Sequence, residues 1–400
     1  MLNANEQKII NLIRTSQADT QSQLCKLTKI NSSTMTYLLG RLRKKGLVVE
    51  IGKRISGPGK PAVVLKCAPP GHIIAIAIDS SKTIIGLMNT SGFIFEKCIM
   101  EMDIKIAPEK VLKNILTLAG KLLKATDAGW DTVSLIGLSI NGTVSNGILE
   151  FSTVLPWRNL PIVAIISKLT GREVVCSDGR CRAVTESRQS IYKDYSSILY
   201  FNVADGVSVA YVAKGELFLG LNSRIGEIGH VVFKPNGYLC GCGQKGCLQT
   251  LISGPAICRE IADDERKIGS NPPQELASLL KLARKGYAEQ SIDKLVELAY
   301  KSNSQYARVF LRKIELYAAQ ALAVSIALFN PHVVLINGYV FRNREQLILN
   351  LRQKVHNLYA PSNNHYLPEF RSTVLGDETG LQCIAMLCSD ELQIRLHERV

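Results

Sequence analysis

The sequence predicts an α/β protein in which an N-terminal winged helix-turn-helix precedes a body of two α/β lobes. Two observations predict this class. The first 66 residues are strongly basic and combine helical spacing of apolar residues with two short strands, and the remainder alternates apolar strands with amphipathic helices in two rounds. We predict a head at residues 1–68, a first lobe at 72–195 and a second lobe at 196–400, whose last helix returns to the first lobe.

The charge of the chain is concentrated in the head. Residues 1–66 contain twelve Lys or Arg against three acidic residues, a net charge of +9, whereas the remaining 334 residues carry +5 of the total +14. Such asymmetry is typical of a polyanion-binding head on a nearly neutral body.

Three helices are predicted in the head. Residues 9–13 give the first helix an apolar face, and residues 24–27 do the same for a short second helix that Asp19 or Thr20 can cap. The third helix begins at Asn31 or Ser32 and ends at Gly46. Its inward residues, at helical spacing, are Met35, Leu38, Leu39 and Leu42. This order predicts a helix-turn-helix.

The outward face of the third helix and the wing that follows form the predicted DNA-binding surface. Residues 47–51 and 62–65 are two short strands around a basic, glycine-rich wing. Small polar side chains on the helix can approach base edges, and basic side chains suit phosphates. The predicted DNA-binding residues are Ser32, Ser33, Thr36, Tyr37, Arg41, Lys44, Lys53, Arg54 and Lys60. The alternative is a basic helical bundle that docks on the body or forms dimer contacts.

The body follows a linker at residues 67–72, where Pro and Gly interrupt the periodicity. The first round contains predicted strands at 73–79, 83–89, 93–100, 133–140 and 173–177 and helices at 108–126 and 162–169. The second round contains strands at 197–203, 208–212, 216–219 and 333–337, a helical stretch at 254–328 and a last helix at 380–396. Two similar lobes imply a cleft between them.

A cluster of cysteines with one histidine lies between residues 226 and 249. Three thiolates and one imidazole are a ligand set that tetrahedral Zn²⁺ prefers, and the interleaved glycines let a short loop turn back on one ion. The sequence therefore predicts a structural zinc site formed by His230, Cys240, Cys242 and Cys247, without an open coordination position. The alternative is a set of small buried residues in a glycine-rich turn.

This segment resembles the zinc motif of the ROK family (repressors, open reading frames and sugar kinases), in which Glu-x-Gly-His precedes Cys-x-Cys-Gly-x-x-Gly-Cys. The resemblance extends over nearly the whole chain. The head resembles that of the repressor branch, as in the glucose- and N-acetylglucosamine-responsive repressors, and the kinase branch lacks such a domain. The resemblance implies an actin-like, sugar-kinase-like body, a duplicated ribonuclease-H-like fold, with a sugar in the cleft.

The resemblance also implies the residues that bind this sugar. They are Asp178, Glu227, His230, Ser177, Gln249 and Asn159. Ser177 stands where Asn is usual in the family, and Gln249 where Glu is usual. Asn159 belongs to a Trp-x-Asn segment at the edge of the site. In ROK kinases the Asp is the general base, whereas an Asp after a strand is otherwise expected as a turn or helix cap.

The phosphate-binding loops of ROK kinases are not matched. Those enzymes open with an Asp-x-Gly-Gly-Thr turn, but residues 79–83 contain no glycine, and residues 204–210 contain one where the second loop is normally glycine-rich. Side chains at these positions obstruct the backbone approach that phosphates need. Phosphoryl transfer depends on positioning and charge stabilisation, so we expect a degenerate body that is not an enzyme.

The basic winged helix predicts a sequence-specific transcriptional regulator, and the resemblance to the repressor branch implies a repressor of carbohydrate-metabolism genes. Its expected partners are double-stranded operator DNA, a sugar or sugar phosphate, a second copy in a homodimer or dimer of dimers, and a protein of sugar transport. No apolar run reaches the ~20 residues of a membrane helix, and no signal-peptide pattern opens the chain, so we expect a cytoplasmic protein. The alternatives are an ATP-dependent hexose or amino-sugar kinase that carries a head, and a ligand-free regulator controlled by a protein partner.

Overall fold

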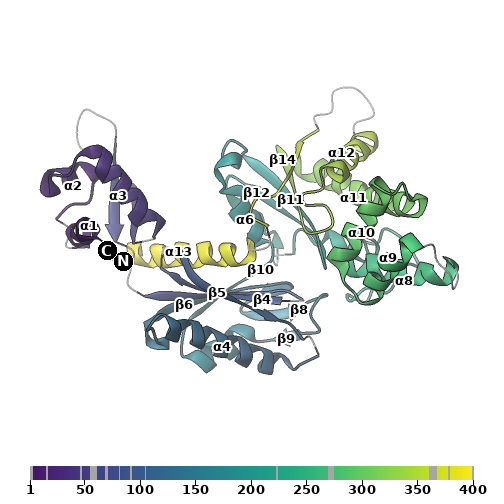
Figure 1. Ribbon diagram of the computed structural model, residues 1–400, viewed down its shortest axis with the longest axis horizontal. Helices are drawn as coiled ribbons and strands as arrows, with labels where there is room; N and C mark the ends of the chain where they lie inside the picture. Colours follow the sequence, from purple (N-terminus) through teal and green to yellow (C-terminus); the bar gives the residue numbers. More distant parts are fainter. Residues whose placement is uncertain are drawn as a thin grey trace. The chain divides into compact units, whose positions relative to one another are not determined.

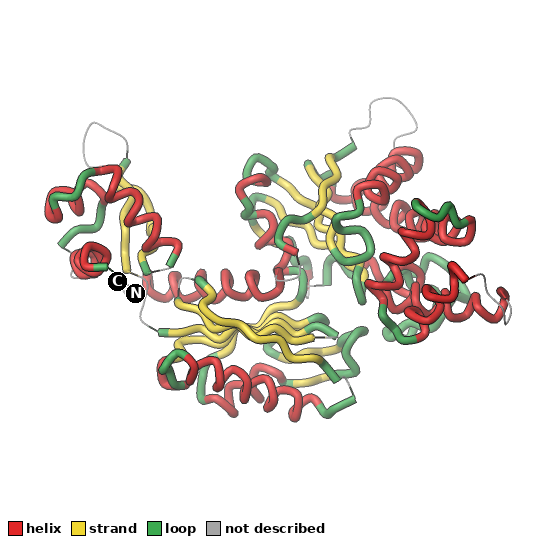
Figure 2. The backbone as a smooth tube through the Cα atoms, in the orientation of Figure 1, coloured by secondary structure: helices red, strands yellow, loops and turns green. Residues whose placement is uncertain are grey.

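The computed structural model describes most of the chain (Figures 1 and 2). The described residues are 3–14, 17–45, 47–54, 61–67, 71–80, 82–90, 92–103, 105–221, 224–268, 274–359, 367–376 and 379–398. They form two compact units: unit 1 is Met1–Ile140, Pro161–Ser177 and Gly380–Val400, and unit 2 is Asn141–Leu160 and Asp178–Thr379. Among the described residues, no helix is long and apolar enough to cross a membrane.

The head, which belongs to unit 1, is a helix-turn-helix followed by two antiparallel strands, as predicted. Its elements are α1 (Ala4–Arg14), α2 (Gln21–Thr28), α3 (Ser32–Lys44), β1 (Val48–Arg54) and β2 (Ala62–Cys67). Thr20 caps α2 in a capping box with Gln23. Asn31 caps α3, because its Oδ1 accepts a hydrogen bond from the backbone N–H of Thr34 (2.8 Å). The four apolar residues of α3 predicted to face inward are buried.

A buried carboxylate connects the first and third helices of the head. The side chain of Glu6 is fully buried and accepts a hydrogen bond from the backbone N–H of Asn3 (2.9 Å). It also pairs with Nε of Arg41 (3.2 Å) and Nζ of Lys45 (3.3 Å). A residue of α1 therefore holds two cations, Arg41 within α3 and Lys45 directly after it. The sequence pattern did not indicate this contact.

The rest of unit 1 is a five-stranded sheet covered by helices. Its elements are β3 (His72–Ile78), β4 (Lys82–Asn89), β5 (Ile94–Glu101), α4 (Pro108–Ala125), β6 (Val133–Ile140), α5 (Ile162–Thr170), β10 (Val174–Asp178) and α13 (Thr379–Glu398). The strand order is β10-β6-β3-β4-β5. The central strand β3 is buried over most of its length, which explains its continuous apolar sequence. Helices α13 and α4 lie on opposite faces of this sheet (Figure 1).

The last helix returns to this first sheet, as predicted. Leu381, Ile384 and Cys388 of α13 pack against Ile73 and Ala75 of β3 in one hydrophobic cluster. The sheet thus receives a covering helix from the far end of the chain. Its other face already has α4, so the central strands are covered on both faces, whereas the edge strand β5 is largely exposed.

Unit 2 contains a second five-stranded sheet, a small three-stranded sheet and a helical part. Its elements are β7 (Thr143–Ser145), β8 (Ile148–Phe151), β9 (Arg158–Leu160), α6 (Cys181–Ser187), β11 (Ser197–Val203), β12 (Val207–Ala213), β13 (Glu216–Leu217), α7 (Gln249–Ile252), α8 (Gly254–Ile268), α9 (Gln274–Arg284), α10 (Ala288–Tyr300), α11 (Gln305–Phe329), β14 (Val333–Asn337), α12 (Glu345–Tyr359) and β15 (Glu369–Ser372). The sheet orders are β13-β12-β11-β14-β15 and β7-β8-β9. The chain therefore forms a winged helix followed by two mixed α/β sheets.

The chain divides between the units differently from the sequence prediction. The predicted first lobe continued to residue 195, but residues 141–160 and 178–195 group with unit 2. Residues 141–160 form their own small sheet there, and α6 packs on β12. Strands β7 to β9 were not predicted, because three or four residues give too little periodicity to recognise. The predicted strand at 216–219 is shorter in the structure, where β13 spans only Glu216–Leu217.

Candidate functional site

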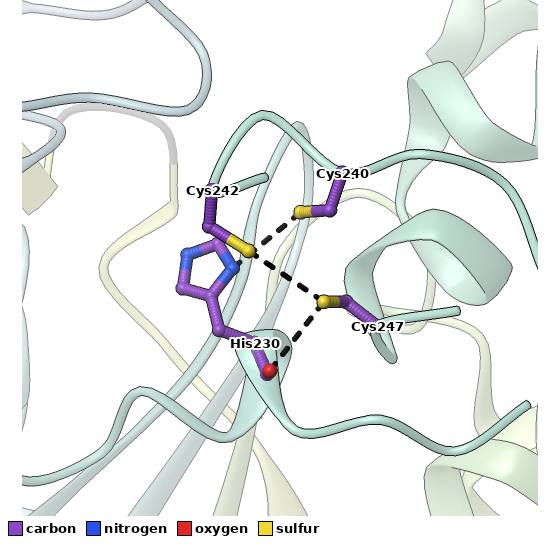
Figure 3. A group of neighbouring side chains, drawn as sticks. All are labelled: His230, Cys240, Cys242 and Cys247. Atoms are coloured by element: carbon purple, nitrogen blue, oxygen red, sulfur yellow. Dashed lines mark hydrogen bonds between the residues drawn. The ribbon is translucent and has the colours of Figure 1, made fainter. Parts of the chain in front are cut away.

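One histidine and three cysteines of unit 2 form a single cluster (Figure 3). Their potential ligand atoms all lie within 4.8 Å of one another. Sγ of Cys242 is 3.6 Å from Sγ of Cys247, and Nδ1 of His230 is 3.5 Å from Sγ of Cys240. Tetrahedral Zn²⁺ with ordinary bond lengths would hold two sulfurs about 3.8 Å apart and a sulfur and a nitrogen about 3.6 Å apart. The predicted ligands are thus brought together at distances that fit one metal ion.

Glycines allow the cysteine loop to turn this tightly. Gly243 and Gly246 have φ values of 95° and 76°, in the left-handed region that side chains disfavour. A Cβ on Gly246 would also overlap the carbonyl oxygen of Lys234. The turn is closed by the backbone N–H of Cys240, which donates to the carbonyl of Gln244 (2.8 Å).

The thiols of this cluster are largely biased toward the neutral form when no cation is present. Burial raises the pKa of Cys247 to about 12, and the hydrogen bond with Cys242 adds to this effect. Burial also raises the pKa of Cys240. Burial acts in the same direction on Cys242, but hydrogen bonds, the first from the backbone N–H of Gln244, lower its pKa below the usual value. A divalent cation would favour all three thiolates, because metal ligands are deprotonated.

Glu227 lies beside the imidazole of His230. Its Oε2 is 3.8 Å from Nε2 of His230, the ring nitrogen opposite the one that faces Cys240. The preceding Gly226 has a φ of 97°, and a Cβ there would overlap the carbonyl oxygen of Val209. Burial raises the pKa of Glu227 and lowers that of His230. The Glu227 side chain is still 38% exposed, so a ligand can reach its carboxylate.

Asp178 ends strand β10 and is paired with Arg180, a residue that the sequence prediction did not include. Nη2 of Arg180 lies 2.6 Å from Oδ2 of Asp178. Nη1 of Arg180 donates to the carbonyl of Ile225 (2.8 Å), two residues before Glu227. The positive charge of Arg180 also acts on the carboxylate of Glu227. A basic residue two positions after the expected base is the sequence signal that could have indicated this pairing.

The other three expected sugar-binding residues, Gln249, Asn159 and Ser177, do not form a common group. Nε2 of Gln249 donates to Oγ1 of Thr153 (3.0 Å). Asn159 lies exposed in β9 with a φ of 47°, and among the described residues no contact connects it with Asp178 or Glu227. Ser177 falls in unit 1, at the point where the chain passes to unit 2. The structure thus groups Asp178, Glu227 and His230 more closely than the rest of the set.

Trp157, at the start of the Trp-x-Asn segment, is a buried side chain rather than an exposed edge. It is 2% exposed, and its Nε1 has no hydrogen-bond partner within the described part of the chain. The neighbouring Arg158 donates from Nη2 to the carbonyl of Gly241 (2.9 Å). Strand β9 is therefore connected to the cysteine loop.

Tyr339 and Asp205 form a hydrogen-bonded pair at the carboxyl ends of the parallel strands β11 and β14. The chain leaves β11 toward β12 on one side and leaves β14 toward β15 on the other, and ligands of open α/β sheets bind at such switch points. There the hydroxyl of Tyr339 hydrogen-bonds to Asp205. A Cβ on Gly254, at the start of α8, would overlap the Tyr339 ring. The Tyr339 side chain therefore fills the space between these loops.

The outward face of α3 carries most of the predicted DNA-binding residues. Those exposed on it are Ser32, Ser33, Thr36, Tyr37 and Lys44. Gln21 of α2 reaches one edge of this face, because its Nε2 donates to Oγ1 of Thr36 (2.7 Å) and to the carbonyl of Ser32 (3.2 Å). A Cβ on Gly40 would meet nothing within 4 Å. The face is polar and open.

Two of the predicted basic contacts have carboxylate partners within the head. Arg41 pairs with the buried Glu6, and Arg54 forms a two-point pair with Asp19 (2.8 and 2.9 Å). The Asp19 pair is exposed, so a phosphate can compete for Arg54. The side chain of Lys53 and all of Lys60 lie outside the described residues.

Comparison with known proteins gives two family matches that together cover most of the chain. The ROK family matches residues 73–391, and the winged helix DNA-binding domain matches residues 2–57. The glucokinase of Thermotoga maritima is 28% identical over 298 residues, which are 74% of this chain and 90% of that protein. The xylose repressor of Caldicellulosiruptor bescii is 24% identical over 407 residues, which are 97% of this chain and 96% of that protein.

Solved structures agree with this pattern. A ROK family transcriptional regulator, a homologue of the E. coli MLC protein, superposes with a TM-score of 0.67 over 98% of this chain and 97% of its own length. At 21% identity this likeness establishes the fold alone. The full-length similarity to repressors includes the head, whereas the similarity to the glucokinase leaves about a quarter of the chain unmatched.

Proposed function

The chain belongs to the ROK family, and from this premise we propose that it is a sequence-specific DNA-binding repressor of carbohydrate-metabolism genes, controlled by a sugar or sugar phosphate. One observation carries the proposal. A winged helix with an open polar face on α3 precedes the ROK body, and the two together are similar to xylose repressors over nearly the full length. A polar helix face flanked by basic residues suits insertion into the major groove of DNA.

The repressor acts on operator DNA as a homodimer or a dimer of dimers. A dimer places two heads on half-sites separated by about one or two helical turns of DNA, so the operator is expected to be two-fold symmetric. The proposed location of this activity is the cytoplasm.

The proposed ligand site is lined by Glu227, by His230 and by Asp178, whose carboxylate is paired with Arg180. Gln249, Asn159 and Ser177 are further proposed contacts. Carboxylate and imidazole groups hydrogen-bond sugar hydroxyls, and the exposed part of Glu227 leaves one of them accessible. The ligand controls DNA binding by having different affinities for two conformations of the protein. A protein of sugar transport that binds the body is a further candidate effector.

A zinc ion held by His230, Cys240, Cys242 and Cys247 has a structural role. The distances within the cluster support this assignment. Four protein ligands leave no coordination position for water, so the ion would not activate a nucleophile. It would hold the His230 ring in place, and this ring lies next to Glu227.

The body of this repressor does not transfer phosphate. The expected general base, Asp178, is engaged by the guanidinium of Arg180. The Tyr339 ring occupies the switch point between β11 and β14, where a nucleotide would be expected in an open sheet. These two observations favour a regulator over the alternative of a sugar kinase.

The test is selection of DNA fragments from the organism's own genome by the full-length protein at two salt concentrations. Non-specific affinity falls steeply with salt. We expect enrichment of a two-fold symmetric site that persists at the higher salt, and the genes beside it nominate the sugar. Retention of DNA without sequence preference, lost at the higher salt, would contradict the proposal. ADP release from ATP and a sugar would favour the kinase instead.

A further inference from the structure

The carboxylate of Asp178 is almost completely occupied by one residue. Oδ1 accepts hydrogen bonds from the backbone N–H of Arg180 (2.9 Å) and from its Nε (3.0 Å), and Oδ2 accepts one from Nη2 (2.6 Å). A carboxylate has about four acceptor positions, so at least three are taken. The side chains of Arg180 and Asp178 are only 8% and 13% exposed. Little capacity remains for the hydroxyl groups of a ligand.

The guanidinium is held on a second side as well. Its Nη1 donates to the carbonyl of Ile225 (2.8 Å), so three of the five N–H groups of the guanidinium have partners. A side chain with a single partner can rotate away when a ligand arrives. Arg180 would have to give up contacts with two separate segments, β10 and the segment before Glu227.

A neutral sugar cannot replace the charge-assisted hydrogen bonds that Arg180 and Asp178 would lose on separation. The Arg180–Asp178 pair is bidentate and charge-assisted, which makes its hydrogen bonds roughly twice as strong as neutral ones. A sugar hydroxyl can donate to Asp178, but it gives the guanidinium no negative partner. Separation of a largely buried pair leaves an uncompensated charge, which is strongly unfavourable.

We propose that Arg180 is a specificity-determining residue that keeps neutral monosaccharides from using Asp178. The inference rests on the proposed sugar-binding function of this site. Ligands that depend on Asp178 bind weakly to the wild-type protein. Removal of the guanidinium releases the two acceptor positions that Nε and Nη2 occupy, so that hydroxyl groups of a ligand can bind there.

The experiment compares full-length wild-type protein with Arg180→Ala and Arg180→Gln by isothermal titration calorimetry. The probes are glucose, xylose and N-acetylglucosamine. We expect the Kd of at least one of these sugars to fall by about tenfold or more in both variants, because a hydrogen bond to a charged group is worth at least a factor of this size. The glutamine can still donate one hydrogen bond, so it serves if the alanine variant does not fold.

Two controls separate this effect from a general loosening of the site. Addition of Asp178→Asn to the Arg180→Ala variant should abolish the gain, because the freed carboxylate is its cause. Arg371→Ala removes another arginine of the same unit, whose ion pair is with Glu369 (2.7 Å), and should leave the Kd unchanged.

Three results would overturn the proposal. If folded Arg180 variants bind no sugar more tightly than the wild type, Asp178 is not being withheld. If they bind a sugar more weakly, Arg180 is itself a ligand contact. A gain that survives Asp178→Asn has another cause. Failure of the proposed repressor function would instead appear as absence of a selected operator, in a separate experiment.

Discussion

Replacement of Glu6 by Gln tests whether α1 restrains the basic residues of the DNA-binding helix. Gln preserves the shape of Glu6 and can still accept the hydrogen bond from Asn3, but it carries no charge for Arg41 or Lys45. Removal of one partner of a fully buried ion pair costs about 3–5 kcal/mol. Here the two cations are 39% and 33% exposed and regain water, so we expect the free energy of unfolding of the head to fall by about 1–2 kcal/mol.

The same substitution changes the pH dependence of head stability. The hydrogen bond from the backbone of Asn3, and then Lys45 and Arg41, lower the pKa of Glu6 against the opposing effect of burial. A carboxyl with a folded-state pKa below its unfolded value stabilises the fold above the unfolded value, about 4.3 for Glu, and this stabilisation is lost as the pH falls through the folded-state pKa. The wild-type head should therefore lose stability on acidification, and the Gln variant should lose less.

DNA binding should respond in the opposite direction from stability. Arg41 and Lys45, once released, can contact phosphates, and each such contact adds about 0.9 to the slope of log K against log salt. We expect the slope for Glu6→Gln to become steeper by about 1–2.

The slope can be measured by fluorescence anisotropy of a labelled duplex over a salt series, and the stability of α1 by hydrogen exchange. Glu297→Gln is the matched control, since it adds the same charge in unit 2, where Glu297 pairs with Lys294 (3.0 Å). It should leave the slope unchanged. An unchanged or shallower slope for Glu6→Gln, with α1 still protected, would refute the view that Glu6 withholds these cations from DNA.

Three further predictions concern unit 2. Cys242→Ser should release zinc, measured by metal analysis, and abolish the response of DNA binding to the inducing sugar, while the head still binds DNA; a normal sugar response would contradict the structural role of the metal. Tyr339→Phe should lower the free energy of unfolding by about 1–2 kcal/mol, because the buried hydrogen bond to Asp205 is lost; unchanged chemical denaturation would show that the hydroxyl does not matter. Because burial raises the pKa of Glu227, its charged form opposes folding as the pH rises through the folded-state value. Glu227→Gln should therefore raise the melting temperature of the ligand-free protein at neutral pH but not at acidic pH, and an equal effect at both would contradict this reasoning.

Local patterns were sufficient for most helices and for the long strands. The third helix of the head has its inward residues at helical spacing and its cap at Asn31, and the structure confirms both. Residues 333–337 were predicted as a buried strand, and β14 has these bounds. The apolar spacing and the cap that predict each element lie within it or next to it, so these predictions do not depend on contacts with distant parts of the chain.

The short strands and the division of the chain between two units could not be predicted from local sequence patterns. Strands β7 to β9 have three or four residues each, and the chain passes between the units at residues 140, 160, 177 and 379. The return of the last helix after residue 379 was predicted, but a prediction that otherwise reads the chain as consecutive lobes cannot place residues 141–160, which leave the first unit, or residues 161–177, which return to it.

The sequence by itself determined the winged helix, the α/β class, the family and the four residues of the histidine and cysteine cluster, because each depends on spacing along one stretch of chain. Only the tertiary structure decided how the charged groups are paired. Glu6 engages cations 35 and 39 residues away, and Tyr339 reaches Asp205 across 134 residues. Arg180 is close to Asp178 in sequence, yet its second contact, with Ile225, is 45 residues distant. A side chain's partner is set by which segments the fold brings together, and this is not encoded in local periodicity.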